Sequence, residues 1–525
     1  MASSARGEIA LAKSMTIPAS TPYLRSAPFF PAVFLLLFHG AAFGQSGSPL
    51  PLSGQPAGNG SVSSTQTAVP GTTTSVNTLN PAIQVQGPYA GSANGADEAP
   101  FSGKLSLREA IQRGIAHNLG AIGLSQAVRE AHAQSRVARS ALLPNLNSDL
   151  SEVVEQVNIR ALGVRLSSSA AGASIPSVVG PFNYFDLRAR LSQTVADLTA
   201  WNNYRASIDT VRANEFLSKD ARDLVTLAVG GAYVQVIAAQ ARLTSARAQL
   251  DTANALFQQA SERRAVGLLA QIDVNRSQVQ VLTQQQRLVS LQNDLAKQKI
   301  NLARLTGLPP SDGFELTDDI PFAPAPAITL EDALKQALDQ RPDLKAAQAQ
   351  VRAAGRALTA ARAERFPSLT FSANYGAIGT NPAQSQGTFS VVGSLNVPIW
   401  QGGRTEGDIE RADAVLVQRK AEASDTISRI ESDVRNAWLD MQAAASQVEV
   451  AQRNREVTQE NFRLTRQRYE AGVTDNIEVV QSQDAVAAAE LDYISGVFAH
   501  NVAKLSLARA LGGAADKVER FLKLK

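Results

Sequence analysis

The chain has 525 residues and a formal net charge of +3, and its Lys and Arg residues are spread along the sequence rather than gathered in a basic block. This distribution argues against a nucleic-acid-binding protein. Cysteine is absent, which excludes disulfides, thiolate metal sites and an N-terminal lipid on cysteine. Aromatic residues make up only 6% of the chain, a composition that suits long helices better than a thick globular core.

The N-terminal region predicts an exported protein. Residues 27–44 read APFFPAVFLLLFHGAAFG and follow a leader that carries three basic residues. The apolar run is too short to span a membrane comfortably and ends in small residues, so we interpret residues 1–44 as a secretory signal peptide. Translation from Met15 and a helical anchor are the alternative interpretations.

Residues 45–104 form a predicted linker. No residue between positions 46 and 96 is charged, and Ser, Thr, Gly, Pro, Asn and Gln dominate the composition. Such a segment buries too little apolar surface to offset its ordering entropy. We therefore predict a flexible segment, with order beginning near Leu105. No later stretch has 18 consecutive apolar residues, which argues against membrane-spanning helices in the mature protein.

From Leu105 onward the sequence repeats itself. The stretches that align without a gap are 105–146 with 328–369 and 257–307 with 462–512. Shared residues include Leu107/Leu330, Val128/Val351, Pro144/Pro367, Gly267/Gly472 and Gly307/Gly512. The predicted parts are a first repeat at 105–308, a Pro-rich linker at 309–327, a second repeat at 328–512 and a C-terminal tail at 513–525.

Each repeat is predicted to open with a helix. The first begins with Ser106-x-x-Glu109 and the second with Thr329-x-x-Asp332. This capping-box pattern satisfies free backbone N–H groups at a helix start. Both aligned stretches close at a proline, where a helix has to stop.

Segments with period two follow each proline. In SLTFSANYGAI, residues 368–378, every second residue from Leu369 to Ala377 is apolar, and the residues between them are polar or Gly. Residues 389–399 and 185–195 alternate in the same way, and the segment after Pro144 alternates more weakly. Runs of about ten residues with one apolar and one polar face have the length of tilted strands that cross a bilayer.

The remaining segments predict very long helices, since proline is absent between residues 182 and 308 and after Pro398. Apolar residues recur there with a strict 3.5 period, at Val225, Val229, Ala232, Val236, Ala239, Leu243, Ala246, Leu250, Ala253 and Phe257, and again at Ile427, Ile430, Val434, Ala437, Met441, Ala444, Val448 and Ala451. This period specifies left-handed packing of helix on helix. We expect a helix over about residues 203–266, a turn at Gly267 and a return helix to about Leu305.

The two periodicities constrain each other. Four amphipathic strands cannot close a barrel, and lipid forbids open sheet edges. If these strands cross a membrane, several chains must contribute to one barrel, and the helical hairpins would extend it into the periplasm as a hollow stalk. A soluble β-sandwich beside a coiled coil is the alternative interpretation.

The doubled unit, the strand pairs and the turns RRAVGLLAQIDV and RYEAGVTDNIEV resemble TolC-type outer-membrane efflux proteins over residues 105–512. The resemblance implies a mixed α and β membrane protein. Its fold would be a homotrimer with a twelve-stranded transmembrane β-barrel, four strands per chain, continued by an α-helical coiled-coil periplasmic tunnel. It also implies an outer-membrane duct for efflux or type I secretion. Energy would come from an inner-membrane pump joined by a periplasmic adaptor.

The resemblance assigns the two Gly-centred turns to hairpin tips at the periplasmic mouth. In the family, tip residues of the VGL kind contact the adaptor. Val266, Gly267 and Leu268 fit that pattern well, while Ala471, Gly472 and Val473 fit it loosely. Glycine suits such a turn because the chain reverses there with a positive φ. A turn with exposed apolar residues and no partner is the alternative.

The resemblance also implies a pore constriction. Glu478 matches a position that forms an acidic ring on the axis, and such a ring favours cations. The family's second acidic ring falls on Gln481, and its neighbouring tip arginine falls on Thr474, so this chain departs from the pattern twice. Asp273 and Tyr469 match positions that close the tip by hydrogen bonding. Acidic residues near helix N-termini are also favourable for purely structural reasons.

Other classes of function have less support. The sequence has no GxSxG elbow, P-loop, HExxH or dinucleotide fingerprint, and its four histidines show no metal-ligand spacing. We therefore expect no enzyme, cofactor or metal. A periplasmic adaptor has one hairpin flanked by lipoyl-like modules, whereas this chain has two equivalent hairpins. That adaptor and a structural coiled-coil protein without a pore remain the alternatives. The cargo and the pump class are open.

Overall fold

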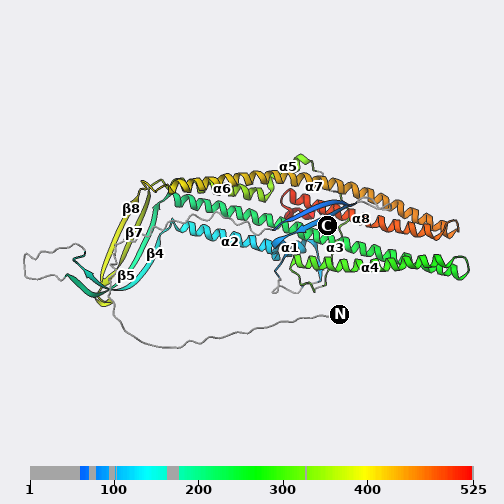
Figure 1. Cartoon of the computed structure of the whole chain (residues 1–525), viewed down its shortest axis with the longest axis horizontal. Coiled ribbons are helices and arrows are strands. Elements are labelled where there is room, and N and C mark those ends of the chain that lie inside the picture. Colours follow the sequence, from blue (N-terminus) through cyan, green and yellow to red (C-terminus); the bar gives the residue numbers. More distant parts are fainter. Residues whose placement is uncertain are drawn as a thin grey trace, which may run out of the picture. The chain divides into compact units, whose positions relative to one another are not determined.

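The computed structural model describes residues 60–69, 78–93, 101, 103–161, 177–311, 313–324 and 328–522. The predicted signal peptide lies outside these residues, as do parts of both predicted linkers. The described chain is mostly helical and contains one four-stranded sheet and two two-stranded sheets (Figure 1).

The same order of elements occurs twice along the chain. The first series is α1 (Leu107–His117), α2 (Leu119–Ser140), β4 (Asn145–Asn158), β5 (Val178–Ala196), α3 (Leu198–Ala265) and α4 (Gln271–Thr306). The second series is α5 (Leu330–Gln340), α6 (Pro342–Ala363), β7 (Ser368–Gly379), β8 (Gln386–Asn396), α7 (Arg404–Glu470) and α8 (Asn476–Ala510). Corresponding long helices have nearly equal lengths, 68 and 67 residues for α3 and α7 and 36 and 35 for α4 and α8.

The predicted helix starts are confirmed. The Ser106 hydroxyl accepts a hydrogen bond from the Glu109 backbone N–H at 3.2 Å, and the Thr329 hydroxyl accepts one from the Asp332 N–H at 3.1 Å. Each bond satisfies an N–H group that has no partner within the helix. The helices α2 and α6, which follow, both end before the proline that precedes the next strand.

The four-stranded sheet has the order β4-β5-β7-β8, and all its pairs are antiparallel. Its register aligns the apolar residues Leu146, Leu191, Ala373 and Val391 in one row across the sheet, and the polar residues Asn147, Arg190, Asn374 and Ser390 in the next row. Because successive side chains of a strand point to opposite faces, one face is apolar and the other polar. The predicted period-two strands are thereby confirmed. Within the described residues, β4 and β8 have no outer strand partner.

The long helices pack in the order α4-α3-α8-α7. The predicted 3.5-residue pattern is confirmed on α3, where eight of its ten positions are buried and Leu250 and Phe257 are partly buried. On α7 the positions from Ile430 to Ala451 are all buried. Ile427 is the exception, since it is exposed and Thr426 is buried beside it. An 18-residue window of α3 has a mean hydropathy of 1.6, and 72% of it is buried, as befits a central helix.

Short elements surround the middle of the long helices, and we call them the collar. The collar consists of α1, α5, α9 (Ala514–Leu522) and the parallel pair β3 (Lys104–Leu105) and β6 (Glu315–Leu316). Within the predicted C-terminal tail at 513–525, residues 514–522 form α9, which buries Val518, Phe521 and Leu522. Phe521 and Leu522 follow Val518 by three and four residues, so the three side chains lie on one face of α9.

The prediction of a flexible linker was wrong for residues 60–69 and 78–93. Strand β1 (Val62–Val69) pairs antiparallel with β2 (Thr78–Val85), and the 3₁₀ helix η1 (Gly87–Ala90) follows. We call β1 and β2 the N-terminal hairpin. Val62 and Tyr89 are buried in the main apolar cluster, against which Ile83 and Val85 also pack. A segment rich in Ser, Thr, Gly, Pro, Asn and Gln has too little apolar surface to form a core alone, but here α3 and α8 supply the apolar surface.

Candidate functional site: the hairpin tips

The first tip joins α3 to α4 through Gly267. Its φ is 79°, the left-handed conformation that glycine adopts without steric cost. The Leu268 N–H donates to the Arg263 carbonyl at 2.9 Å, and the Gly267 N–H donates to the Arg264 carbonyl at 3.0 Å. These bonds satisfy carbonyl groups at the end of α3, and the Arg264 guanidinium also donates to the Gln271 side-chain oxygen across the turn at 3.1 Å.

The second tip joins α7 to α8 with the same geometry. Gly472 has a φ of 72°, and the Val473 N–H donates to the Arg468 carbonyl at 2.9 Å. Helix α8 is capped by the Asp475 carboxylate, which accepts from the backbone N–H groups of Ile477 and Glu478. Helix α4 has Ala270 as its N-cap residue and therefore no side-chain cap. The positive φ predicted for both glycines is thus confirmed, and the second tip is fixed more firmly.

Apolar side chains stand exposed at both tips. Val266 is 70% exposed, Leu268 77% and Val473 67%. Gly267, Ala471 and Gly472 are exposed as well. All six predicted contact residues therefore lie on the free surface of this chain, three at each tip. Exposed apolar side chains on tight turns are available to a partner surface.

Two side chains, Arg263 and Asn476, make polar contacts between the tips. The Arg263 guanidinium lies 4.4 Å from the centre of the Tyr469 ring, and it donates to the Tyr469 carbonyl at 3.2 Å. The Asn476 amide donates to the Asp273 carbonyl at 3.1 Å and to the Ser277 hydroxyl at 3.0 Å. We call these the cross-tip contacts. Sequence reasoning missed Arg263, Ser277 and Asn476 as members of the site.

Asp273 and Tyr469 take part in the cross-tip contacts but do not bond to each other. The Asp273 carboxylate pairs with Arg276 at 3.1 Å, and only its backbone carbonyl meets α8. Tyr469 is 4% exposed and packs with Leu256 and Val479, while its hydroxyl oxygen is buried without a hydrogen-bond partner. Within the described chain, neither the Asp273 carboxylate nor the Tyr469 hydroxyl forms a hydrogen bond to the opposite tip. The latch role of these two residues stays a prediction.

The predicted constriction residues lie along the start of α8. Glu478 is half exposed and forms an ion pair with Arg468 at 3.3 Å. Gln481, one turn further, is exposed, and the Thr474 hydroxyl is buried without a partner. Because a neighbouring guanidinium offsets part of the Glu478 charge, a ring of three such carboxylates would be only moderately acidic.

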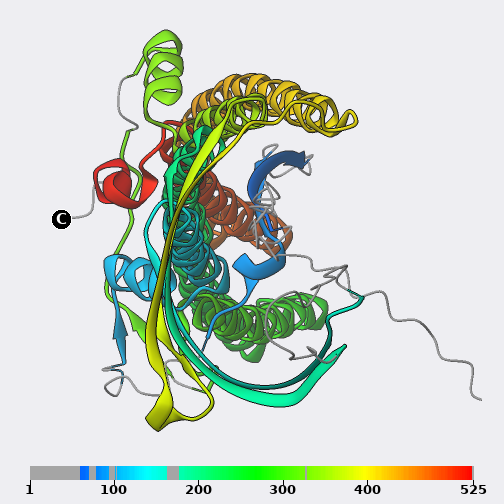
Figure 2. The ribbon, with the colours of Figure 1, turned by 90° about the vertical axis from the view of Figure 1, so that its left-hand side faces the viewer.

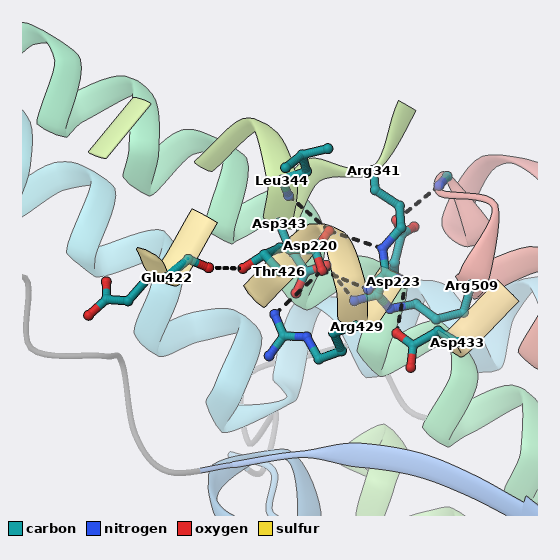
Figure 3. A network of polar contacts seen from close by, with 11 residues as sticks. Asp220, Asp223, Arg341, Asp343, Leu344, Glu422, Thr426, Arg429, Asp433 and Arg509 are labelled. Carbon is teal, nitrogen blue, oxygen red and sulfur yellow. Dashed lines mark hydrogen bonds and ion pairs between the residues drawn. The ribbon is translucent and has the colours of Figure 1, made fainter. Parts of the chain in front are cut away.

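A second polar cluster lies where α3, α6, α7 and α8 meet the collar helix α9 (Figure 3). Arg341 is 3% exposed and forms ion pairs with Asp343 at 2.6 Å and Asp433 at 2.9 Å. Arg509 pairs with Asp220 at 2.5 Å. Asp223 accepts from the backbone N–H groups that open α9. The cluster thus connects α3, α6, α7, α8 and α9, which identifies it as a structural joint.

Burial and pairing shift the pKa values of this cluster in opposite directions. Burial raises the pKa of Asp220 to about 6, although Arg509 opposes the shift. Burial would also raise the pKa of Asp343, but the hydrogen bonds and charge of Arg341 outweigh it and hold that pKa below its usual range. The Asp343 carboxylate is therefore the firmly ionised partner of Arg341.

A sheet with one apolar and one polar face, continued by long paired hairpins that end in exposed apolar tips, defines a membrane-associated channel component. Comparison with known proteins identifies the protein family. The family model described as "Outer membrane efflux protein" matches residues 124–308 and 333–513, and the chain belongs to this family. It is an outer-membrane efflux channel with a large periplasmic portion.

Curated relatives and solved structures agree with this membership. The chain is 25% identical to the pyoverdine export outer membrane protein OpmQ of Pseudomonas aeruginosa over 78% of this chain and 86% of that protein. It is 25% identical to the outer membrane protein OprJ of the same species over 80% and 87%. The fold matches that of VceC from Vibrio cholerae with a TM-score of 0.65 at 19% identity, covering 78% of this chain and 96% of that one.

Proposed function

We propose that the protein acts as a homotrimer in which three four-stranded sheets close one transmembrane barrel of twelve strands. The supporting observation is that β4 and β8 end the sheet without an outer partner in the described chain. Lipid cannot satisfy the free N–H and C=O groups of a sheet edge. Pairing β4 of one chain with β8 of the next removes every edge, and three chains give a barrel within the usual size range.

The helices support the same assembly. α4 and α7 are the outer members of the order α4-α3-α8-α7, and each exposes a second apolar stripe. The stripes consist of Val279, Leu282, Val289 and Ile300 on α4 and of Leu439, Val450, Val457 and Leu464 on α7. Their spacings are sums of three- and four-residue steps, the pattern of a coiled-coil seam. A neighbouring chain would cover both stripes and close the helices into a tunnel. The proposal rests on these two observations together: the sheet has unpaired edge strands, and the outer helices have uncovered apolar stripes.

The repeated order of elements supports a chain that consists of two copies of one structural unit. The two matched stretches of the family model fall one in each series. Three chains then place six tips around the periplasmic mouth. The Glu478 carboxylates would form the acidic ring, with Gln481 one turn further along. The cross-tip contacts would hold the mouth closed, together with any bonds that Asp273, Tyr469 and Thr474 make to neighbouring protomers.

The tips also suit a periplasmic partner. Val266, Leu268 and Val473 expose apolar surface that an adaptor would cover, and the adaptor would link the channel to an inner-membrane pump. The duct itself performs no catalysis and needs no cofactor, since the pump supplies the energy. Relatives are named for pyoverdine export and for toluene efflux, two unlike cargoes. Selection of the cargo therefore belongs to the pump in this proposal.

The assembly is tested by its oligomeric state in detergent. Mass measurement and electron microscopy of the purified protein should show trimers. Val457→Glu places a charge on the α7 stripe and should yield monomers, whereas Gln452→Glu, on another exposed position of α7, should leave the trimer intact. A native protein that is monomeric and stays in water without detergent would refute the proposal.

A further inference from the structure

The N-terminal hairpin lies on one particular face of α3. The Tyr233 hydroxyl donates to the Leu105 carbonyl at 3.0 Å and to Asp318 at 2.9 Å, so Tyr233 faces the collar. Gly231, two residues earlier, faces Ile83, and a Cβ added there would lie 1.7 Å from the Ile83 Cδ1 atom. Two residues correspond to about 200° around an α-helix. The hairpin and the collar therefore lie on opposite faces of α3.

Helix α8 shows the same division. Lys504 is fully buried and bonds to the Ala323 carbonyl, in the segment that continues from β6. Ser506, two residues later, is hydrogen-bonded to Ser64 of β1. The two side chains again point in nearly opposite directions. α3 and α8 thus form a layer between the collar segment on one side and the N-terminal hairpin on the other.

The curvature of the four-stranded sheet shows which side of the α3–α8 layer faces the interior of the proposed tunnel. Figure 2 shows the four-stranded sheet curving around the side on which the N-terminal hairpin lies, with α1, α5 and α9 on the other side. The concave face of a sheet that closes into a barrel faces the interior. In the trimer of the proposed function, on which this step rests, the hairpin side of α3 and α8 is accordingly the inner side of the tunnel.

The hairpin has a helix-facing and a free face. Val62 is buried, and Ser64, Ile83 and Val85 are partly buried toward the helices. Ser61, Ser63, Thr65, Gln84 and Gln86 are exposed. The exposed residues alternate with the packed ones, as a strand with one covered face requires. All five are polar and uncharged.

We propose that the N-terminal hairpin is a luminal element: three copies project into the tunnel at the level of the collar and narrow it, forming a second constriction besides the tips. Its free face offers hydroxyl and amide groups but no charge. An uncharged polar lining imposes no preference for the sign of a cargo's charge, unlike the acidic tips. The hairpin therefore restricts cargo by size, and the tips act on charge.

Thiol labelling tests this placement, because the chain has no native cysteine. Ser63→Cys puts a thiol on the free face of the hairpin, and Lys335→Cys puts one on the exposed surface of α5 as the control. Purified detergent-solubilised trimers are treated with N-ethylmaleimide and with a polyethylene glycol maleimide too bulky for a protein pore. Small reagents should label both variants.

The bulky reagent should label Ser63→Cys at least about tenfold more slowly than Lys335→Cys, because pore diameter limits its entry. Unfolding in detergent should abolish the difference. Equal labelling of the two variants in intact trimers would overturn the luminal placement while leaving the channel function standing. A native protein that forms no trimer would overturn the proposed function and this inference with it.

A deletion tests the constriction itself. The Gln86 N–H donates to the Ser61 carbonyl at 2.8 Å, so the two ends of the hairpin segment are adjacent. Removing residues 61–86 and joining Gly60 to Gly87 should leave the helices undisturbed and relieve the size limit. In trimers whose tips are opened by Asn476→Ala, the deletion should allow larger neutral polymers to pass in bilayer exclusion measurements than the intact hairpin does. An unchanged exclusion size in folded trimers would refute the constriction.

Discussion

The collar and the tips hold the same long helices by different means. In the collar, almost every residue of α8 from Phe498 to Ala510 is buried, since other elements cover the helix on several sides. At the tips, the apolar cluster contains only Leu256, Tyr469 and Val479 as buried members. Apolar burial dominates folding stability, so the collar end is the stable part of the hairpins and the tip end the weaker part.

The polar contacts differ in the same direction. Arg341 in the collar is buried and pairs with two carboxylates. At the tips, Arg263 reaches the opposite hairpin through one hydrogen bond to a backbone carbonyl group, and Asn476 does so through a backbone carbonyl group and a hydroxyl group, all of them uncharged acceptors. Elements that move are drawn from the regions of low local stability. The difference indicates that the tips open while the collar stays fixed, and the following variants test it.

The largest effect is expected in the collar. Arg341→Met leaves Asp343 and Asp433 without their partner, and breaking a buried ion pair in this way costs about 3–5 kcal/mol. Arg429→Met is the control, because Arg429 is 57% exposed and 4.0 Å from Asp343, and such a pair contributes less than about 1 kcal/mol. Urea unfolding followed by circular dichroism measures both. Equal losses would contradict the assignment of Arg341 as a structural joint.

Acid should weaken the collar through His500. Its side chain is fully buried, and burial, with the nearby Lys504 charge, lowers the His500 pKa to about 4 from 6.5. Between these values the folded state binds fewer protons than the unfolded state. The His500 contribution to the free energy of unfolding therefore falls as pH drops from 6.5 toward 4, by about 3 kcal/mol in total. Asp220, whose pKa is raised to about 6, contributes in the opposite direction below pH 6, so the His500 contribution is read from the difference between the native protein and a His500 variant.

The variant His500→Gln should remove this slope, and His132→Gln, at an exposed histidine, should keep it. The measurement is unfolding at several pH values between 7 and 4 for both variants and the native protein, an interval set by the two pKa values. An identical pH dependence in all three proteins would show that His500 is not the responsible group.

Periodicity predicted the main elements because it reports on burial. The 3.5-residue pattern of α3 and α7 and the alternation of β5, β7 and β8 each follow from one packed face. The N-terminal hairpin escaped prediction because its packed face consists of a few residues on short strands, and its partner surface comes from α3 and α8. Composition alone carries no information about such a distant surface.

The tips also combine features that the sequence predicted with features that it did not. The glycine turns and the exposed apolar residues are local features, and the sequence predicted them. The cross-tip contacts connect residues about 200 positions apart, such as Asn476 with Asp273, and most end on backbone carbonyl groups that any residue possesses. The signal that could have revealed the Asn476 contact is its polar amide side chain at a position that is buried in the structure, where Asn476 is 3% exposed. A buried polar side chain requires a partner.

Asn476→Ala should open the mouth. It removes the bonds to the Asp273 carbonyl and the Ser277 hydroxyl, at a cost of about 1–2 kcal/mol that is confined to the tips. Single-channel conductance in planar bilayers should rise while collar unfolding stays unchanged. Gln278→Ala, which alters an exposed amide on α4, is the control.

Asp273→Ala keeps the carbonyl and should raise conductance less than Asn476→Ala. A larger rise for Asp273→Ala would instead show that its carboxylate bonds to a neighbouring protomer. Tyr469→Phe provides the same comparison for the phenol, because the ring and the carbonyl that contact Arg263 remain. These three conductances separate contacts within a chain from contacts between chains.

The smallest effect concerns the charge at the mouth and leaves stability untouched. Glu478→Gln removes the carboxylate and frees the Arg468 guanidinium, so the preference for cations should fall. Gln481→Glu adds a carboxylate at an exposed position one turn further, and cation preference should rise. Reversal potentials in asymmetric KCl measure both changes, with Glu460→Gln as a control on the exposed surface of α7. Because the collar lies far along the same helices, neither substitution should alter the exclusion size there. If both substitutions leave the reversal potential unchanged, the start of α8 does not line the narrow part of the pore.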